Sequence, residues 1–359
     1  MTANIADATS LLNRSFNIGK AAGWDAVGLQ FGDPQAKAVS VAVCHEVTPA
    51  VAEELLARRV DLAVTYHPLL FRPIRSLVAG SGASGRAFRL IAGGVALYSV
   101  HTAYDVQPGG TADKLAAALQ LADVRGFGPA WSDEARKVVT FVPTADVSKL
   151  LDAMADAGAG RIGNYTHCSY RSEGEGTFLP EADADPVVGR KGIVNHAAET
   201  RLEMIAPAHE LDGVVAALVA AHPYEEPAFD VVPVDANAGF IGRSGRLPRP
   251  HSMAELADLV GQRVGGLVRV AGEGSVETVT VIPGSGGGML GDVTTDAVVT
   301  GDVSHHEARD AVVRGIGIVD PGHAATERPG VRALYAAVAG LFDEVIDLTD
   351  VDCDPWKER

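Results

Sequence analysis

Short aliphatic runs alternate with helix-length stretches at the start of the chain, and this alternation limits the folds available to it. Residues 36–44 (AKAVSVAVC), 60–65 (VDLAVT) and 94–100 (GVALYSV) read as strands, and residues 48–59 (TPAVAEELLARR) read as a helix. Strands separated by a helix of that length are most simply joined by parallel crossovers. The first part of the chain therefore predicts an open α/β layer.

The end of the chain repeats this pattern. Strand-like runs occupy residues 275–282, 296–300, 317–320 and 342–348, and helical patterns occupy 305–315 and 331–340. Each half also has a strand that ends in His, followed four residues later by a carboxylate: His101 with Asp105, and His323 with Glu327. We expect the two halves to form one sheet. An internal structural repeat and chance both remain explanations for their likeness.

The stretch between the halves, residues 136–234, follows a different pattern. A strand at 137–142 leads through Pro143 into a helix at 146–158, and a strand at 200–206 leads through Pro207 into a helix at 209–221. Proline suits the first helical turn, which has no backbone hydrogen bond to lose. With a final strand at 229–234, these units predict a ferredoxin-like or PII-like domain. Residues 235–251, rich in Gly, Pro and Arg, read as a return linker.

The length of 359 residues exceeds the usual size of one hydrophobic core, which favours more than one domain. We expect an α/β protein in which two related α/β halves form one metal-binding core. The halves would be residues 1–130 and 236–359. A ferredoxin-like (PII-like) α+β domain, residues 131–235, would be inserted between them.

Charge and composition narrow the partners. A formal net charge of -16 repels phosphate backbones and anionic lipid surfaces, so nucleic acid is an unlikely partner. No run of apolar residues is long enough to span a bilayer and the N-terminal stretch lacks a signal-peptide pattern, so we expect a cytoplasmic protein without a membrane partner. Cys44, Cys168 and Cys353 form no CxxC pair, so any metal would use nitrogen and oxygen ligands.

The segment GHAATE, residues 322–327, is the sharpest local feature. His323 and Glu327 are four residues apart, so on a helix they share one face. An imidazole and a carboxylate on one turn suit zinc, iron or manganese. The alternative is an ordinary helix start, in which Thr326 and Glu327 only cap or meet solvent.

Two further strand ends carry the same residue types. His67 follows the strand 60–65, and His101 and Asp105 follow the strand 94–100. Functional side chains in open α/β sheets gather at the carboxyl ends of strands. A buried histidine satisfied by a backbone carbonyl is the alternative for His67 alone. Three such strand ends on one sheet predict a shared site, where a bridging carboxylate holds two divalent metal ions.

Three other segments are weaker signals. TGDVSHHEARDA, residues 300–311, offers Asp302, His305, His306 and Glu307, of which His306 would contact substrate unless it is part of a solvated helix start. GSGGGML, residues 284–290, could approach a phosphate but lacks the GK[ST] ending of a P-loop. HPYEEP, residues 222–227, offers His222, Glu225 and Glu226 but fits an ordinary turn equally well.

Together, WDAVGLQFG (24–32), TYHPLLF (65–71), SVHTAYD (99–105), TGDVSHHEARDA and DPGHAATE (320–327) resemble the signature of the Ngg-interacting-factor-3-like family, known as GTP cyclohydrolase 1 type 2 homologs. The middle segment resembles the PII-like domain inserted in its longer bacterial members.

The resemblance implies a toroidal homohexamer with dinuclear metal centres. The ligands would be His67, Asp105, His323 and Glu327, with Glu327 as the bridge. The chain departs from the family's HHP pattern because Tyr66 occupies the first histidine position, and Ala26 stands where many members carry Asn. The family name does not establish cyclohydrolase activity.

Two functions follow as hypotheses. The first is a metal-dependent hydrolase of a nucleotide or another phosphorylated or heterocyclic small molecule, with His306 or His101 as the catalytic group that moves protons. The second is a noncatalytic regulator or scaffold that binds metal and senses a ligand through its inserted domain. A purely structural metal in a protein that acts through surface contacts is a third interpretation.

Overall fold

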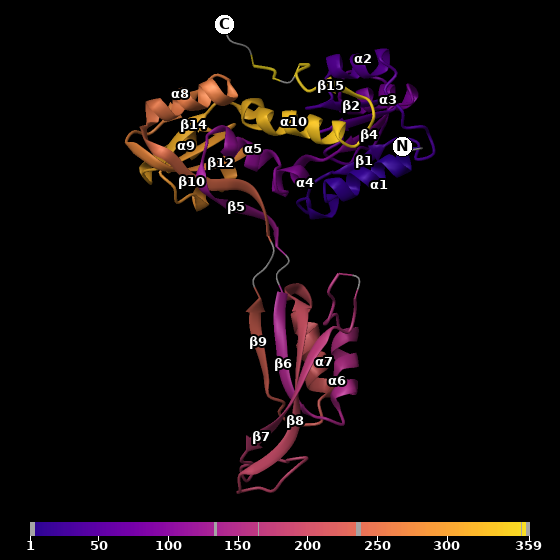
Figure 1. The fold of residues 1–359 in the computed structure, drawn as a ribbon, viewed down its shortest axis with the longest axis vertical. Helices are drawn as coiled ribbons and strands as arrows, with labels where there is room; N and C mark the ends of the chain where they lie inside the picture. The colour runs from indigo at the N-terminus through magenta and orange to yellow at the C-terminus, as the bar shows by residue number, and fades with distance from the viewer. Residues whose placement is uncertain (1–3, 133–134, 164, 235–237, 353, 357–359) are drawn as a thin grey trace. The chain divides into compact units, whose positions relative to one another are not determined.

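The computed structural model describes residues 4–132, 135–163, 165–234, 238–352 and 354–356. It divides into two compact units (Figure 1). Unit 1 comprises Met1–Trp131 and Gly239–Arg359, and unit 2 comprises Ser132–Ala238.

Unit 1 contains a five-stranded sheet with the order β1-β4-β3-β2-β15. Its strands are β1 (Gly28–Phe31), β2 (Val41–Cys44), β3 (Leu62–Thr65), β4 (Ala96–Ser99) and β15 (Val345–Leu348). Strands β15, β2, β3 and β4 are parallel, as the helix-length spacing predicts for the last three, and β1 is antiparallel to β4.

Helices cover both faces of this sheet, which explains its continuous aliphatic strands. Val41 and Val43 pack with residues of α1 (Ile5–Ser15) and α10 (His323–Ala339) on one face. The alternate residues Ala42 and Cys44 pack with α2 (Pro49–Ala57) and α3 (Ala83–Ala92) on the other.

A second sheet lies in the same unit, with the order β11-β14-β13-β12-β10-β5. Its strands are β5 (Ala122–Ser132), β10 (Ala238–Ser252), β11 (Arg269–Ala271), β12 (Ser275–Ser285), β13 (Ala297–Gly301) and β14 (Gly317–Asp320). The prediction that the two halves form one sheet is therefore wrong. Each sheet has its own parallel triplet, β2-β3-β4 or β12-β13-β14, with an antiparallel strand beside the last member.

Strand β10 corrects a second prediction, because the described part of residues 235–251 is a long strand and not a linker. Its backbone pairs with β12, and this pairing overrides the Gly, Pro and Arg composition. Pro248 and Pro250 fall between Arg246 and His251, where the register shifts. Proline is tolerated at such irregularities because no ladder hydrogen bond is lost there.

Helix α10 serves both sheets of unit 1, which also contains further helices. They are α4 (His101–Val106), α5 (Thr111–Ala118), α8 (Met253–Val264), α9 (His305–Val313) and the short 3₁₀ helices η1 (Ile18–Lys20) and η3 (Gly287–Asp292). Helix α10 packs against α5 and β12 and also against β2. Its Ala325 belongs to the core of the second sheet, whereas Val331 and Leu334 belong to the core of the first.

Unit 2 is an antiparallel sheet with two helices. Its elements are β6 (Ala135–Pro143), α6 (Val147–Asp156), β7 (Ser169–Phe178), β8 (Asn195–Pro207), the 3₁₀ helix η2 (Ala208–Glu210), α7 (Leu211–Ala221) and β9 (Phe229–Val234). The sheet order is β7-β8-β6-β9. Leu150 and Leu218 of the helices pack with Val138 and Leu202 of the strands in one core.

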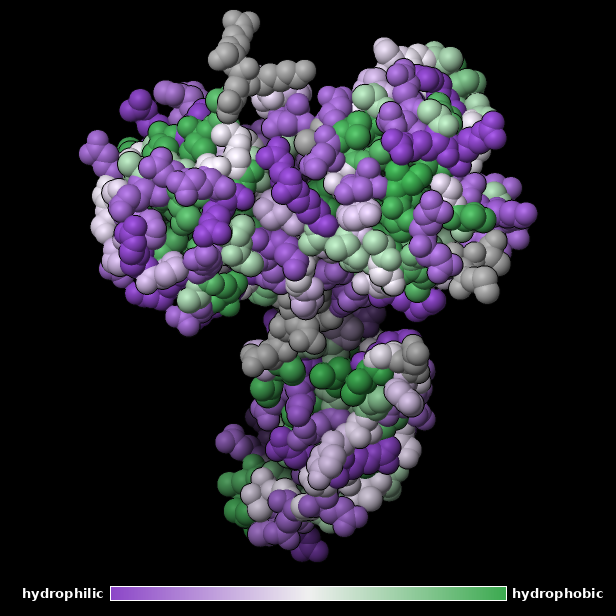
Figure 2. Space-filling model, turned by 45° about the horizontal axis from the view of Figure 1, so that its top comes forward, coloured by the Kyte–Doolittle hydropathy of each residue, from purple (hydrophilic) through white to green (hydrophobic). Residues whose placement is uncertain are grey.

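The surface of unit 2 retains apolar residues among hydrophilic ones, as the space-filling view shows (Figure 2). Several lie in the segment after β7: Leu179, Val187, Val188, Ile193 and Val194. Across the described residues, every helix is too short or too polar to cross a lipid bilayer. Cys44 and Cys168 are free thiols, and Cys353 lies outside the described residues.

Candidate metal centre

Three parallel strand ends bring imidazoles to one edge of the first sheet. His45 follows β2, His67 follows β3, and His101 begins α4 just after β4. The backbone N–H of His67 donates to the His45 carbonyl at 2.9 Å, and that of His101 donates to the Tyr66 carbonyl at 3.0 Å. These bonds extend the sheet beyond its strands and hold the side chains together.

Glu327 reaches the same place from α10. This carboxylate is 2% exposed, and its Oε2 lies 2.7 Å from Nε2 of His45 and 3.0 Å from Nε2 of His67. Its Oε1 lies 3.1 Å from Nε2 of His323, on the preceding helical turn. Three imidazole nitrogens therefore converge on one buried carboxylate.

The geometry suits a divalent cation. The ligand atoms of His45, His67 and Glu327 all lie within 4.8 Å of one another. Two ligand atoms on a tetrahedral zinc ion are about 3.3 Å apart, so a small outward shift would admit an ion. Buried nitrogen and oxygen donors fit zinc, iron or manganese, and these residues form a group that could hold a metal.

Two carboxylates orient the outer histidines. Oδ1 of Asp25 lies 2.8 Å from Nδ1 of His101, and Oδ2 of Asp302 lies 2.6 Å from Nδ1 of His323. A carboxylate can only accept, so each Nδ1 carries the proton and Nε2 is the nitrogen left for a ligand or a proton. Carboxylates behind metal-binding histidines have this role in many metal sites.

The charges of the cluster are strongly coupled. Burial acts to raise the pKa of Glu327, but His67, His323 and His45 outweigh it and hold that pKa well below the usual value. Burial lowers the pKa of His67, against the opposing effect of Glu327, and so favours the neutral imidazole that binds metals.

His323 differs from His67. Burial again acts to lower its pKa, but the carboxylates of Glu327 and Asp302 raise it to about 9. Without a metal, His323 is therefore a cation at neutral pH.

Asp105 has a different partner. Its Oδ1 accepts a 2.6 Å hydrogen bond from the Tyr66 hydroxyl, and both side chains are buried. Burial raises the pKa of Asp105 to about 6, and the charge of Glu327 contributes to the rise. The charge of the cluster therefore acts on Asp105, although the Asp105 carboxylate is hydrogen-bonded to Tyr66.

His101 has a left-handed backbone, with φ of 31°. Non-glycine residues adopt such angles at a cost, and they concentrate at functional sites. Burial acts to lower the pKa of His101, but Asp25, with Asp105 and Glu327, outweighs this effect and the net shift is upward.

Glycine shapes the floor of the cluster. Gly284 lies in β12 with φ of 66°, and a Cβ added there would lie 2.6 Å from Oε1 of Glu327 and 3.3 Å from the His323 ring. The Gly-rich segment 284–290 therefore lets the backbone approach the carboxylate closely.

The segment 300–311 contributes Asp302 to this cluster, but its other candidates have other roles. His306 is exposed on the first turn of α9, and its recorded ring neighbour is His305 at 5.4 Å. Glu307 forms a capping box with Ser304. In unit 2, His222 accepts from the backbone N–H of Tyr224 and lies 3.1 Å from the Phe141 carbonyl, so it serves a turn.

Five residues of this cluster were candidates from the sequence, namely His67, His101, Asp302, His323 and Glu327, whereas His45 and Asp25 were missed. His45 follows the strand-like run 36–44, so the rule that pointed to His67 also applies to it. Asp25 lies in the WDAVG segment, where its spacing alone gives no indication of a partner in α4.

The fold and the cluster define a mixed α/β protein with a histidine- and carboxylate-rich site suited to transition metals. Residues 3–353 match the family model described as Duf34/NIF3 (NGG1p interacting factor 3). The chain therefore belongs to the Duf34/NIF3 family, as the resemblance of its motifs predicts.

Named relatives agree with this assignment. The chain is 35% identical over 346 residues to the GTP cyclohydrolase 1 type 2 homolog of Bacillus subtilis, with 92% of each chain covered. It is 36% identical over 373 residues to the homolog of Mycobacterium tuberculosis, covering 99% of this chain and 97% of that one.

Solved structures share the fold. A Bacillus cereus protein related to NIF3 superposes with a TM-score of 0.67 at 33% identity, with 100% of each chain covered. A Staphylococcus aureus protein superposes with a TM-score of 0.72 at 24% identity, with 99% of each chain covered.

Proposed function

We propose that the chain is a metal-dependent hydrolase of a nucleotide or a related phosphorylated or heterocyclic small molecule. The observation that carries this proposal is the convergence of His45, His67 and His323 on the buried carboxylate of Glu327. The shared name of its relatives, GTP cyclohydrolase 1 type 2 homolog, supports a nucleotide as the first substrate class to test.

The two oxygens of Glu327 favour a dinuclear centre. Oε2 faces His45 and His67, and Oε1 faces His323. A carboxylate divided in this way is suited to bridge two divalent ions of zinc, iron or manganese. His67, His323 and Glu327 would be ligands as the sequence predicts, His45 joins them, and Asp105 would serve the second ion once its bond to Tyr66 is broken.

A bound divalent ion would supply Lewis acidity and lower the pKa of a water molecule at the site. His101 is the group that we expect to move protons. Its Nδ1–H donates to Asp25, which fixes the ring and leaves Nε2 to accept or release a proton. His306 stays a prediction as a substrate contact, since its exposed place on α9 provides no such orientation.

The organisation of the whole protein extends the proposal. Unit 2 has the element order and the antiparallel strand order of a ferredoxin-like domain, which supports the insertion of a PII-like domain at about residues 131–235 between core segments 1–130 and 236–359. We also propose that the protein acts in the cytoplasm as a homohexamer.

Metal-loaded protein provides the test. Purified chain loaded separately with zinc, iron or manganese should hydrolyse members of a nucleotide panel, and His323→Ala should lose that turnover. His209→Ala, which alters a side chain that is 80% exposed, is the matched control. Equal turnover by the wild type and His323→Ala would reject the hydrolase.

A second candidate is a noncatalytic metal-binding regulator whose inserted domain senses a ligand. A cavity of about 950 Å³ in unit 2 favours it. If the cavity regulates the metal site, a ligand bound there must change metal affinity, and metal must change ligand affinity by the same factor. Calorimetric titration of each with and without the other measures that factor. A value of one would reject the regulator.

A further inference from the structure

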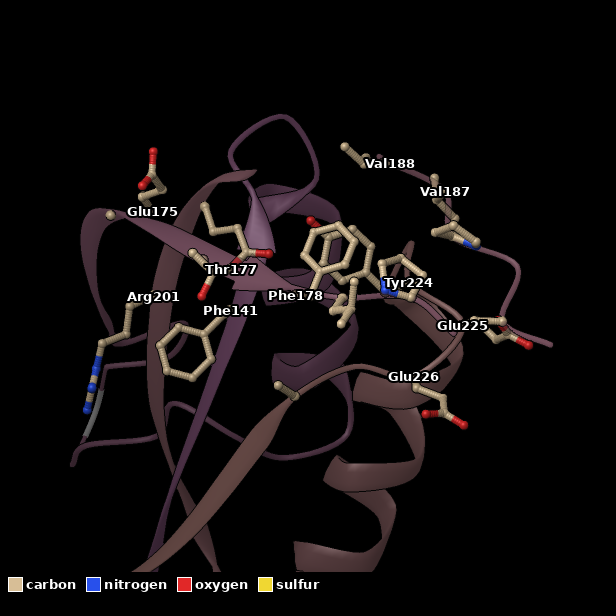
Figure 3. A pocket seen from close by; sticks show the side chains of 18 of the residues that line it. Phe141, Glu175, Thr177, Phe178, Val187, Val188, Arg201, Tyr224, Glu225 and Glu226 are labelled. Carbon is tan, nitrogen blue, oxygen red and sulfur yellow. The ribbon is translucent and has the colours of Figure 1, made fainter. Parts of the chain in front are cut away.

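The cavity of unit 2 has the size of a small-molecule site. It measures about 950 Å³ and lies among the ends of β6, β7 and β8, the segment after β7 and the turn before β9 (Figure 3). Ligand pockets typically enclose about 300–1,000 Å³. None of its residues belongs to the metal centre.

Aromatic rings form one part of the wall. Phe141, Phe178 and Tyr224 all line the cavity, and the rings of Phe178 and Tyr224 lie 6.5 Å apart at 45°. Phe178 and Tyr224 are close together in Figure 3, with Phe141 below Thr177. Such faces attract apolar groups and, through their quadrupoles, cations.

The charges of the wall are almost all negative. The lining residues carry seven carboxylates and one guanidinium, that of Arg201. Arg201 is already engaged, because its Nε donates to Glu203 at 2.8 Å and its guanidinium lies 5.9 Å from the centre of the Phe141 ring. The field inside the cavity therefore favours a cation.

Glu199 is the carboxylate that the strand pairing brings into the cavity. It lies opposite Gly174 on β7, and a Cβ on the next glycine of the same face, Gly176, would collide with its carboxylate. Among the described residues, Glu199 has no recorded ion pair. Two glycines in a strand weaken it, and here they provide space for an acidic group.

Tyr224 adds a polar group. Its hydroxyl is buried and lies within reach of the Glu199 carboxylate, with no other partner among the described residues. Burial and the nearby Glu199 raise the pKa of Tyr224 to about 12, so the phenol stays neutral. A ligand with a polar atom near its cationic end would complete the bonding of this hydroxyl.

We infer that this cavity binds a small organic cation with an aromatic or aliphatic body, of the arylalkylamine or alkylguanidine class. The ammonium or guanidinium group lies against Glu199, and the body packs on Phe141, Phe178 and Tyr224. The inference names a ligand class for the sensing domain of the second candidate function. Direct binding tests it whether or not the ligand affects the metal centre.

Calorimetric titration of the full chain at pH 7 supplies the test. The probes are three cations, tryptamine, phenethylamine and agmatine, with tryptophol and indole-3-acetate as the neutral and anionic counterparts of tryptamine. We expect at least one of the three cations to bind and indole-3-acetate not to bind. If tryptamine binds, its affinity should be at least tenfold higher than that of tryptophol. Failure of all three cations, or equal affinity across the indoles, overturns the inference.

Variants locate the site. Glu199→Gln removes the charge with little change of shape, and Phe178→Ala removes an aromatic wall. We expect each to weaken binding of the cation at least fivefold. Asp152→Asn removes the same charge from an exposed position on α6 and should leave affinity unchanged. Circular dichroism checks that each variant folds.

An inorganic cation is the competing occupant. If magnesium is titrated alone and binds here, its affinity should fall in Glu199→Gln but not in Phe178→Ala, since an aromatic ring provides no oxygen ligand. Magnesium binding with that pattern, together with no binding of the organic probes, overturns the inference. Loss of affinity in both variants but not in Asp152→Asn supports it.

Discussion

The hydroxyl of Tyr66 donates a 2.6 Å hydrogen bond to Oδ1 of Asp105. The resemblance of the motifs implies histidine at this position. Here a phenol occupies it and bonds to Asp105, one of the predicted metal ligands. The phenol is a poor substitute for an imidazole, because burial and the charge of Asp105 raise the pKa of Tyr66 well above its usual value. Tyr66 therefore stays protonated and continues to donate.

We predict that Tyr66→His increases the metal content of the protein by releasing Asp105 and adding an imidazole. Elemental analysis after dialysis against zinc measures this content per chain. Tyr66→Phe is the control, since it removes the hydroxyl without adding a ligand. It frees Asp105 as well, so it should bind less metal than Tyr66→His, and it should lose about 1–3 kcal/mol of unfolding free energy because the Asp105 carboxylate loses its donor. Equal metal content in Tyr66→His and the wild type would contradict the prediction.

Gly284→Ala should weaken metal binding, because its side chain would crowd the metal centre. The new methyl group would lie 2.6 Å from Glu327 Oε1, and the backbone φ of 66° adds strain of about 1–2 kcal/mol. Gly315→Ala is a matched control, because Gly315 has φ of 81° but open space around its Cβ position. Both variants should lower the thermal midpoint, but only Gly284→Ala should lose metal. Equal metal affinity in the two would show that Glu327 and His323 tolerate displacement.

The pKa of His323 predicts opposite effects of pH on stability and on metal binding. In the metal-free protein this pKa is raised from 6.5 to about 9. The stabilisation that it provides is complete below pH 6.5 and is lost as the pH rises through 9. Because the side chain is one-third exposed, we expect a loss of about 1–2 kcal/mol and not the full value of the shift.

Metal affinity should rise across the same interval, because a cation must displace the proton on Nε2 of His323. Chemical unfolding and zinc titration at several pH values between 6 and 9.5 measure the two trends. His323→Gln should flatten both. A metal affinity that is independent of pH in the wild type would exclude His323 as a ligand.

Asp25→Asn should lower the pKa of His101. Burial already acts to lower it, and Asp25 is the largest opposing influence. The amide can still accept at Nδ1, so the ring should keep its place while its basicity falls. Titration of the imidazole by nuclear magnetic resonance measures the change. An unchanged pKa would mean that Asp105 and Glu327 suffice to raise it.

Local patterns predicted much of this structure. The runs at 60–65 and 317–320 are strands because aliphatic residues buried on both faces leave a continuous apolar sequence. His323 and Glu327 lie on one face of a helix because GHAATE begins α10 after a strand. In both cases the information lies within a few residues of the feature.

Nonlocal pairing was beyond such patterns. Val345 pairs with Val41, and Arg243 pairs with Val281. The local sequence around Val345 or Arg243 does not indicate which strand is its partner. The division into two sheets and the strand nature of residues 238–252 depend on these choices. The contact between Glu327 and His45 likewise depends on helix α10 reaching the first sheet, which no spacing in the chain expresses.

The edge strands of unit 1 are exchanged between its halves. Strand β5, which precedes unit 2 in the chain, lies at the edge of the second sheet, and β15, from the end of the chain, lies at the edge of the first. A gene divided at unit 2 would therefore encode two fragments, each lacking the neighbour that shields an outer strand. Such fragments should aggregate when produced separately and regain a folded core only when synthesised together.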